Sequence, residues 1–254
     1  TQFLKAKGFE FGTPKSGEVF VVMQLKAASN IATAGNNPPV YWWGTGANDE
    51  LIWSDYNRYN SWGSNARKNW NWTQAAYSTS GFDPMYPAIQ NISSRANRWE
   101  YNSVTHVLGV PKQEFYGTNS NTVAWTTTTD RMSKIGVDFL GDVAEVIVYD
   151  TFLNLDQKRK VRSYLSVKYG MMMDSIHYAS DGTIIFNPST IGSQKYQVYT
   201  IGRDDAYGLK QKQSGGNEDI DGTGLIIGLG ELQGINEENN SNFIYSVGTD
   251  KGKG

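Results

Sequence analysis

A single stretch with helical periodicity, set among strand-like runs, most constrains how this chain can fold. The stretch "TFLNLDQKRKVRSYLSVKYG" covers residues 151–170. Asn154, followed three residues later by Gln157, has the pattern of a capping box, and Gly170 is a typical C-terminal stop. We therefore expect one helix over residues 155–169, which separates two β-rich segments of the chain.

The rest of the sequence favours β-structure. Short apolar runs alternate with Gly, Asn, Ser and Thr clusters, and only 19% of the residues are charged. Such a composition is typical of a turn-rich β protein. The expected helix presents Val161, Tyr164 and Leu165 as its apolar face. The clearest strand-like runs are 17–29, 98–110, 112–118, 122–129, 141–150, 182–187, 196–202, 224–230 and 242–248.

Composition also excludes several kinds of protein. The formal net charge is −2 with both signs interleaved, so no basic stripe indicates a nucleic-acid partner. No apolar run approaches the roughly 18 residues of a membrane-spanning helix, so we expect no membrane insertion. Cysteine is absent, which excludes disulfides and thiolate zinc sites. His106 and His177 are isolated from other metal ligands, so a zinc site is not expected.

Three motifs carry a family resemblance. The sequence "GDVAEVIVYDTFLNLDQKRKVRSYLSVKYG" (141–170) resembles the last strand and helix of bacterial laminin-G-like (concanavalin A-like) domains. The earlier "YNSWGSNARKNW" (59–70) is similar to a stretch that precedes the middle strands of these domains. The later "IGRDDAYGLKQKQS" (201–214) resembles the start of an uncharacterised β domain that often follows them.

The resemblance implies a fold and a general role. It implies an all-β, concanavalin A-like antiparallel sandwich of two sheets with one C-terminal helix, followed by a smaller β segment. The expected domains are residues 1–172, helix included, and residues 173–254. It also implies a calcium-assisted module of a large multidomain protein, secreted or on the bacterial cell surface, which binds a glycan or peptide on another cell.

Glu145 is the first candidate for catalysis, since it lies in the middle of the strand-like run 141–150. Retaining β-glucanases of the concanavalin A-like fold carry several carboxylates on alternate residues of one strand. Their acid and nucleophile must lie about 5–5.5 Å apart. No E-x-D-x-(x)-E motif, nucleophile elbow or His near a Ser-rich turn occurs here. We expect Glu145 to be structural and the protein to be no enzyme.

The sequence "NEDIDG" (217–222) indicates a possible calcium loop. Asn217, Asp219 and Asp221 alternate as calcium-loop ligands do, and Gly222 permits the sharp turn. The glutamate expected at the twelfth position is replaced by Gly228. The alternative is a solvated acidic turn. Similar but weaker candidates are "GRDDAYG" (202–208) and "GANDE" (46–50).

An aromatic window supplies the candidate ligand site. Six of the eight tryptophans lie within residues 41–72, among Asn, Asp and Arg. Aromatic faces stack on sugar rings and peptide planes, whereas polar neighbours fix hydroxyl or carboxylate groups. The alternative is that these rings fill the sandwich core. The predicted ligand-binding residues are Trp43, Trp53, Asp55, Tyr56, Arg58 and Trp62.

Three hypotheses about function follow. The first is a non-enzymatic adhesin-type binding module, based on the resemblance of residues 141–170 and the absence of a catalytic motif. The second is an enzyme or accessory module acting on polysaccharide, with the aromatic window as its subsites. The third is a structural spacer domain in a long surface protein.

Overall fold

The protein divides into two compact units. Unit 1 comprises Thr1–Ser103 and Glu114–Leu153, and unit 2 comprises Val104–Gln113 and Asn154–Gly254. The computed structural model describes residues 4–6, 16–25, 39–44, 50–55, 58–61, 87–95, 98–107, 110–112, 117–119, 132–135, 141–149, 151–171, 173, 175–190, 197–215, 226–229 and 245–249. Of the expected strand-like runs, 122–129 lies outside these residues.

Two antiparallel sheets account for the first part of the chain. The five-stranded sheet has the order β1-β10-β3-β4-β5, with β1 and β5 at its edges. Its strands are β1 (Leu4–Ala6), β3 (Pro39–Gly44), β4 (Glu50–Asp55), β5 (Arg58–Ser61) and β10 (Met132–Ile135). All neighbouring strands of this sheet pair antiparallel, which matches the hairpin-rich pattern of the sequence.

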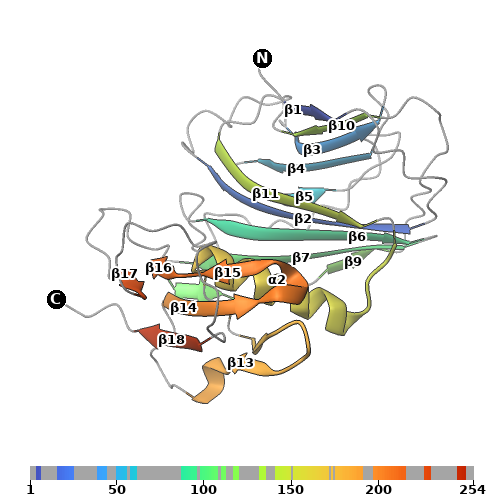
Figure 1. The fold of residues 1–254 in the computed structure, drawn as a ribbon. Coiled ribbons are helices and arrows are strands. Elements are labelled where there is room, and N and C mark those ends of the chain that lie inside the picture. Colours follow the sequence, from blue (N-terminus) through green and yellow to red (C-terminus); the bar gives the residue numbers. More distant parts are fainter. Residues whose placement is uncertain are drawn as a thin grey trace. The chain divides into compact units, whose positions relative to one another are not determined.

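The six-stranded sheet has the order β11-β2-β6-β7-β8, with β9 paired to β7. Figure 1 shows β11, β2 and β6 side by side as long, curved strands. The strands are β2 (Ser16–Leu25), β6 (Ala88–Arg95), β7 (Arg98–Val107), β8 (Val110–Lys112), β9 (Gly117–Asn119) and β11 (Gly141–Tyr149). Strand β5 of one sheet contacts β6 of the other. The expected all-β sandwich is therefore confirmed.

Strand β2 is buried on both faces. Its central residues from Val19 to Met23 are at most 4% exposed. An almost continuous apolar run is what a strand enclosed on both faces requires, whereas a strand with one wet face would alternate. Phe20 also meets the ring of Tyr149 in β11 edge-to-face, at 6.2 Å between centroids. This strand forms the centre of the unit 1 core.

A buried carboxylate lies at the start of this core strand. Glu18 is 0% exposed, and its Oε1 accepts a hydrogen bond from Asn91 Nδ2 at 2.6 Å. Its Oε2 accepts from the backbone N–H of Leu153 at 3.2 Å. Asn91 Nδ2 also donates to the carbonyl of Val19 at 3.1 Å. Buried carboxylates need such donors, so this network joins β2, β6 and the segment after β11.

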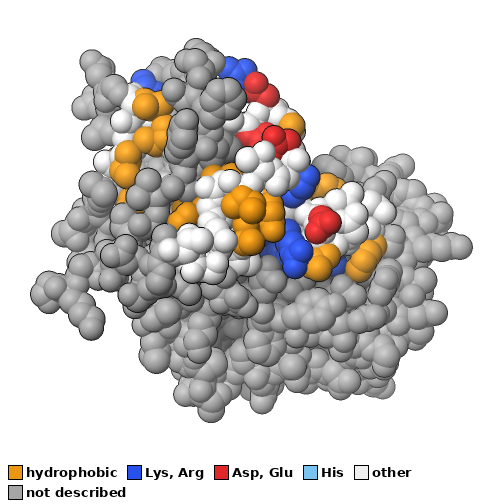
Figure 2. Space-filling view, turned by 90° about the horizontal axis from the view of Figure 1, so that it is seen from below, with side chains coloured by type: hydrophobic (Ala, Val, Ile, Leu, Met, Phe, Trp, Pro, Cys, Tyr) orange, Lys and Arg blue, Asp and Glu red, His pale blue; other side chains and the backbone are white. Residues whose placement is uncertain are grey.

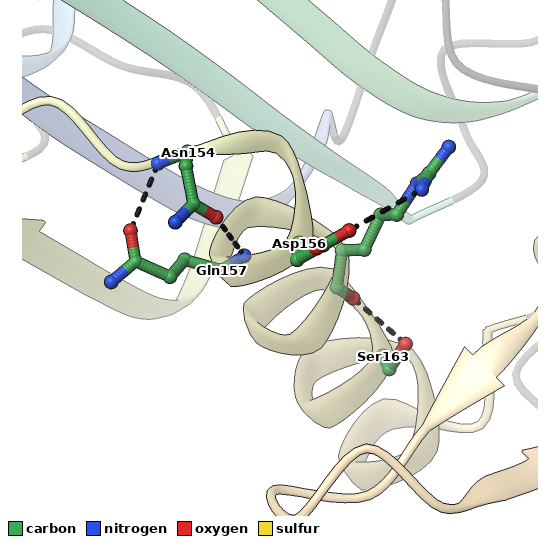
Figure 3. Close-up of polar contacts among 5 residues, drawn as sticks. Asn154, Asp156, Gln157 and Ser163 are labelled. Carbon is green, nitrogen blue, oxygen red and sulfur yellow. Dashed lines mark hydrogen bonds and ion pairs between the residues drawn. The ribbon is translucent and has the colours of Figure 1, made fainter.

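The expected helix is present as α2 (Leu155–Tyr169), the α-helix that the described residues contain. Figure 3 shows its capping box, in which Asn154 Oδ1 accepts from Gln157 N and Gln157 Oε1 accepts from Asn154 N, each at 2.9 Å. Gly170 ends the helix with φ +64°, a conformation that glycine adopts without strain. Local sequence signals therefore determine both ends of α2.

The buried face of α2 is more polar than expected. Val161 and Leu165 are buried as predicted, but Tyr164 is half-exposed. The other buried residues of the helix are Lys158, Arg162, Ser163, Ser166 and Val167. Tertiary contacts in unit 2 supply partners to the serines, as described below, so polarity and burial coexist on this face.

The strands of unit 2 surround one side of this helix. Strand β12 (His177–Tyr178) packs on α2 and pairs with β13 (Ile184–Phe186) to form a hairpin. Strand β14 (Gln197–Asp204) lies between β15 (Leu209–Gln211) and β18 (Tyr245–Thr249) and also contacts α2. Two short 3₁₀ turns, Pro188–Thr190 and Asp205–Tyr207, interrupt the strands.

The helix α2 contacts strands β12, β14 and β15, which all belong to unit 2. Gln211 Nε2 in β15 donates to the carbonyl of Val167 at 3.0 Å, which ties the end of the helix to the three-stranded sheet. The contact-based units divide the chain between Leu153 and Asn154. The sequence-based division into residues 1–172 and 173–254 stays a prediction, although the helix itself packs on elements of the later segment.

Candidate functional site

Four of the predicted ligand-binding residues lie on neighbouring strands of the five-stranded sheet. Trp43 is in β3, Trp53 and Asp55 are in β4, and Arg58 is the first residue of β5. Tyr56 and Trp62 lie outside the described residues. Trp53, Asp55 and Arg58 therefore lie in the two strands at the β5 edge of the sheet, whereas Trp43 lies in its central strand.

The strand register separates these residues into two places. Asp55 is the cross-strand partner of Arg58, and Trp53 is the partner of Ser61 in the same hairpin. Trp43 is instead the partner of Glu50, at the opposite end of β4. Three residues of strand, about 10 Å at roughly 3.3 Å per residue, separate Glu50 from Trp53. Trp53, Asp55 and Arg58 thus form one group, from which Trp43 is distant.

A local irregularity marks the same hairpin. The register shifts between the pairs of Trp53 and Asp55, and a second shift lies between the pairs of Pro39 and Tyr41. Irregular pairing at a sheet edge bends a strand and re-aims its side chains, and is frequent beside binding sites. We refer to Trp53, Asp55 and Arg58 as the β4–β5 group.

The predicted calcium ligands Asn217, Asp219 and Asp221 lie outside the described residues, but the two strands that bracket them are described. Strands β16 (Gln213–Gly215) and β17 (Ile226–Gly228) are antiparallel, with Gly215 paired to Ile226. The segment 216–225 therefore connects the two strands of a hairpin. Within the described ranges, no three His, Asp or Glu side chains are grouped as a metal site.

The acidic residues of "GRDDAYG" have protein partners. Asp204 is 9% exposed, and its two carboxylate oxygens accept from Ser180 N at 2.8 Å and Ser180 Oγ at 2.6 Å. Asp205 is exposed and accepts from Arg203 Nε. That hydrogen bond lowers the pKa of Asp205 and raises the pKa of Arg203. The described geometry gives both carboxylates a structural role in holding turns.

A Ser–His contact that sequence reasoning missed lies inside unit 2. Ser166 Oγ is 2.7 Å from His177 Nε2, and both residues are 0% exposed. Burial lowers the pKa of His177 from 6.5 to about 4, although the carbonyls of Ser175 and Met171 favour the charged form. A general base works best with a pKa near the operating pH. The enclosed, weakly basic imidazole therefore fits a structural role better than nucleophilic catalysis.

Glu145 lies in the edge strand β11 and is half-buried. Its register partner is Val22, next to an irregularity after Val143. Asp142, the other carboxylate of this strand, is exposed. The irregularity pairs Asp142 with Gln24 and Glu145 with Val22, so the two carboxylates lie on one side of the sheet, but the strand lacks the E-x-D-x-(x)-E spacing of the retaining enzymes. No helix within the described ranges is long and apolar enough to cross a bilayer.

The described surface is chemically mixed. Figure 2 shows hydrophobic, basic and acidic side chains interspersed on the visible face, with no single charge dominating. Exposed large apolar side chains are Leu155, Ile184 and Ile226, which come from three different elements. This face, so far as it is described, does not present a basic patch of the kind that binds nucleic acid.

Comparison with known proteins gives one partial family match. Residues 157–250 match the model of a domain of unknown function, DUF8202. No curated protein matches the chain. The family match covers α2 from Gln157 onward and the strands that follow it, which is most of the later segment of unit 2.

Several solved β-sandwich structures resemble the chain at low identity. The LG1-3 region of the laminin alpha2 chain is 10% identical with a TM-score of 0.42, and the match covers 60% of this chain and 31% of that one. Domain 4 of an extracellular GH43 arabinanase from Geobacillus stearothermophilus, in complex with arabinotriose, is 13% identical with a TM-score of 0.36 and coverages of 56% and 64%. The binding domain of botulinum neurotoxin DC, in complex with SialylT, is 9% identical with a TM-score of 0.38 and coverages of 95% and 55%.

The chain spans less than two thirds of the length of each of these three structures. Every one of the TM-scores is below 0.5. The assignment to the all-β class therefore rests on the strand pairings of this chain, and its function is argued from its own residues.

Proposed function

We propose that this chain is a non-enzymatic binding module of a secreted or cell-surface bacterial protein, and that it recognises a glycan or peptide in adhesion. The β4–β5 group carries the proposal. Its support is that Trp53 and Asp55 lie in β4 and Arg58 in the edge strand β5, with Asp55 and Arg58 as register partners. Aromatic and polar residues gathered at an edge are what a shallow recognition site requires.

The chemistry of the three side chains fits both ligand classes. A tryptophan ring offers a large apolar face at a low cost in side-chain entropy. A carboxylate accepts hydrogen bonds from sugar hydroxyls or peptide N–H groups, and a guanidinium donates in a planar fork to carboxylates. The proposed site needs neither a nucleophile nor a metal at the point of contact.

Calcium is proposed as an assisting ion, bound by Asn217, Asp219 and Asp221. The support is the alternation of hard oxygen ligands before Gly222, together with the hairpin that closes this segment at Gly215 and Ile226. A fixed pair of loop ends lowers the entropy that is lost when the loop wraps an ion.

The test is binding of the intact chain to glycan and peptide arrays, with calcium and with a chelator, followed by calorimetry on each hit. Trp53→Ala and Arg58→Gln should each weaken binding about 5- to 150-fold, as expected for loss of about 1–3 kcal/mol at a contact hot spot. Lys134→Gln, in β10 toward the other edge of the sheet, is the matched charge control and should bind as the parent does.

Three results would overturn the proposal. Turnover of a polysaccharide would make the chain an enzyme or part of one. The absence of binding on every array would favour the structural spacer domain. Loss of the fold in Trp53→Ala, with normal binding by Arg58→Gln, would mean that the aromatic window is core and that the site lies elsewhere. Trp43→Ala separately tests whether the site extends to β3.

A further inference from the structure

Two serines of α2 hold the first strand of the hairpin that follows the helix. Ser163 Oγ accepts from the backbone N–H of Tyr178 at 2.9 Å, and Ser166 Oγ contacts His177 Nε2 at 2.7 Å. Ser163, Ser166 and His177 are each 0% exposed. We call Ser163, Ser166, His177 and Tyr178 the α2–β12 seam. Both contacts use side chains of the helix, so the seam can open without breaking α2 itself.

The hydroxyl hydrogen of each serine is already donated to a backbone carbonyl in the helix or just after it. Ser163 Oγ donates to the carbonyl of Arg159 at 2.8 Å, and Ser166 Oγ donates to the carbonyl of Met171. Each hydroxyl has one hydrogen, so toward β12 both oxygens can only accept. His177 must therefore carry its hydrogen on Nε2. In the neutral ring Nδ1 is then bare, and within the described part of the chain it makes no regular hydrogen bond.

Burial opposes a second proton on the imidazole more strongly than the backbone carbonyls of Ser175 and Met171 favour it. The ring of Phe186 meets it edge-to-face at 5.4 Å, and Met171 and Met173 are buried nearby in sequence. The elements packed on β12 are α2 and β13. Strand β13 has no titratable side chain, and the one acidic residue of α2 is Asp156, exposed in its first turn. The basic residues of α2 include buried Arg162, one turn before Ser166.

We propose that the α2–β12 seam is an acid-sensitive latch, which holds the β12–β13 hairpin on α2 while His177 is neutral and releases it when the ring is protonated. A charged imidazole would be fully buried beside Phe186 and Ser166, with the backbone carbonyls of Ser175 and Met171 as its acceptors, and the two packed elements offer it no nearby carboxylate. Release exposes the ring to water, which solvates the charge.

The size of the effect follows from proton linkage. The pKa of His177 is lowered by burial from 6.5 to about 4 in the closed state, so the open state binds more protons between these values. Closure is therefore fully favoured above pH 6.5 and weakens as the pH falls. The ratio of open to closed molecules should rise about 30-fold by pH 5 and about 300-fold below pH 4, relative to pH 8.

Opening should begin at the His177 end of the hairpin. The turn at the other end is held separately, because Lys160 Nζ donates to the carbonyl of Ser180 at 2.7 Å and Ser180 is bonded to Asp204. The Ala179 N–H also donates to the carbonyl of Thr183 at 2.8 Å, which closes the turn itself. The latch thus frees the base of the hairpin before its tip.

The test is amide hydrogen exchange of the intact chain between pH 8 and pH 4.5, corrected for the intrinsic rate at each pH. Peptides spanning residues 171–186 should lose protection below pH 6, before peptides of β2 do. His177→Gln keeps a donor for Ser166 but cannot be protonated, so the loss should disappear in this variant. His106→Gln replaces the other of the two histidines and should behave as the parent does.

A direct titration keeps the proposal testable if His177→Gln does not fold. With two histidines in the chain, NMR of the imidazole protons gives two resonances, which His106→Gln assigns. A His177 resonance that titrates below pH 5, together with early exchange at 171–186, supports the latch. A resonance that titrates near pH 6.5, or exchange at 171–186 that follows the rest of the chain, overturns it.

Discussion

Replacing Glu18 tests whether a buried carboxylate stabilises unit 1. Glu18→Gln leaves the shape almost unchanged but substitutes an NH₂ group for one oxygen. If the new oxygen faces Leu153 N–H, the new NH₂ group faces Asn91 Nδ2, which stands only 2.6 Å from the present Oε1. Two donors cannot share that distance, so the Asn91 amide must turn.

The turned amide presents Asn91 Oδ1, which has no hydrogen-bond partner within the described part of the chain. Turning the amide breaks the 3.1 Å hydrogen bond that Asn91 Nδ2 now donates to the carbonyl of Val19. A neutral hydrogen bond contributes about 0.5–1.5 kcal/mol and a charged one about 1.5–3 kcal/mol. We expect Glu18→Gln to cost about 1–3 kcal/mol, and Glu18→Ala, which leaves the Leu153 N–H buried without an acceptor, to cost about 2–5 kcal/mol.

Thermal and denaturant unfolding of both variants provide the measurement. The melting temperature should fall by roughly 2–4 °C for each kcal/mol in a chain of this size. Glu145→Gln, a half-buried carboxylate on neighbouring β11, is the matched control and should change stability less. If Glu18→Gln is as stable as the parent or more stable, desolvation of the carboxylate outweighs its hydrogen bonds, and the reasoning is wrong.

Three further outcomes are expected. Asn154→Ala removes the N-cap of α2 and should lower the free energy of unfolding by about 1 kcal/mol in denaturant. An unchanged denaturation midpoint would show that the cap does not stabilise the protein. Asp204→Ala removes both acceptors of Ser180 and should cost about 2–4 kcal/mol, with Asp204→Asn costing less; equal losses would contradict a two-oxygen clamp. Calcium should raise the melting temperature of the parent by mass action, and Asp221→Ala should abolish that rise while the metal-free melting point stays nearly constant. An equal calcium response in the variant would exclude the predicted loop.

The sequence predicts α2 well because its signals are local. The two side chains of the capping box are three residues apart, and Gly170 directly follows the last helical residue. The continuous apolar run of β2 likewise predicts a strand buried on both faces, since its own composition carries the signal. Sequence patterns of this range therefore determine the elements and the all-β class.

Such local patterns do not predict the polar contacts of the interior, because these contacts join residues that are distant in the sequence. Glu18 and Leu153 are 135 residues apart, and Ser166 reaches His177 only after the chain has turned at Gly170. A helical face that contains Arg162 and two serines resembles a solvated face, although tertiary packing buries it. The candidate ligand site was similarly predicted as one window, whereas the register of β4 places Trp43 away from Trp53.

The capping box also determines where a fragment of this protein can begin. The match to DUF8202 starts at Gln157, so a fragment cut there keeps one half of the box and discards Asn154, whose carbonyl also accepts from Lys158 N at 3.0 Å. The first turn of α2 would then be left with open N–H groups and would fray. A fragment that begins at or before Asn154 retains a complete helix start, and expression screens of the C-terminal segment should choose that boundary.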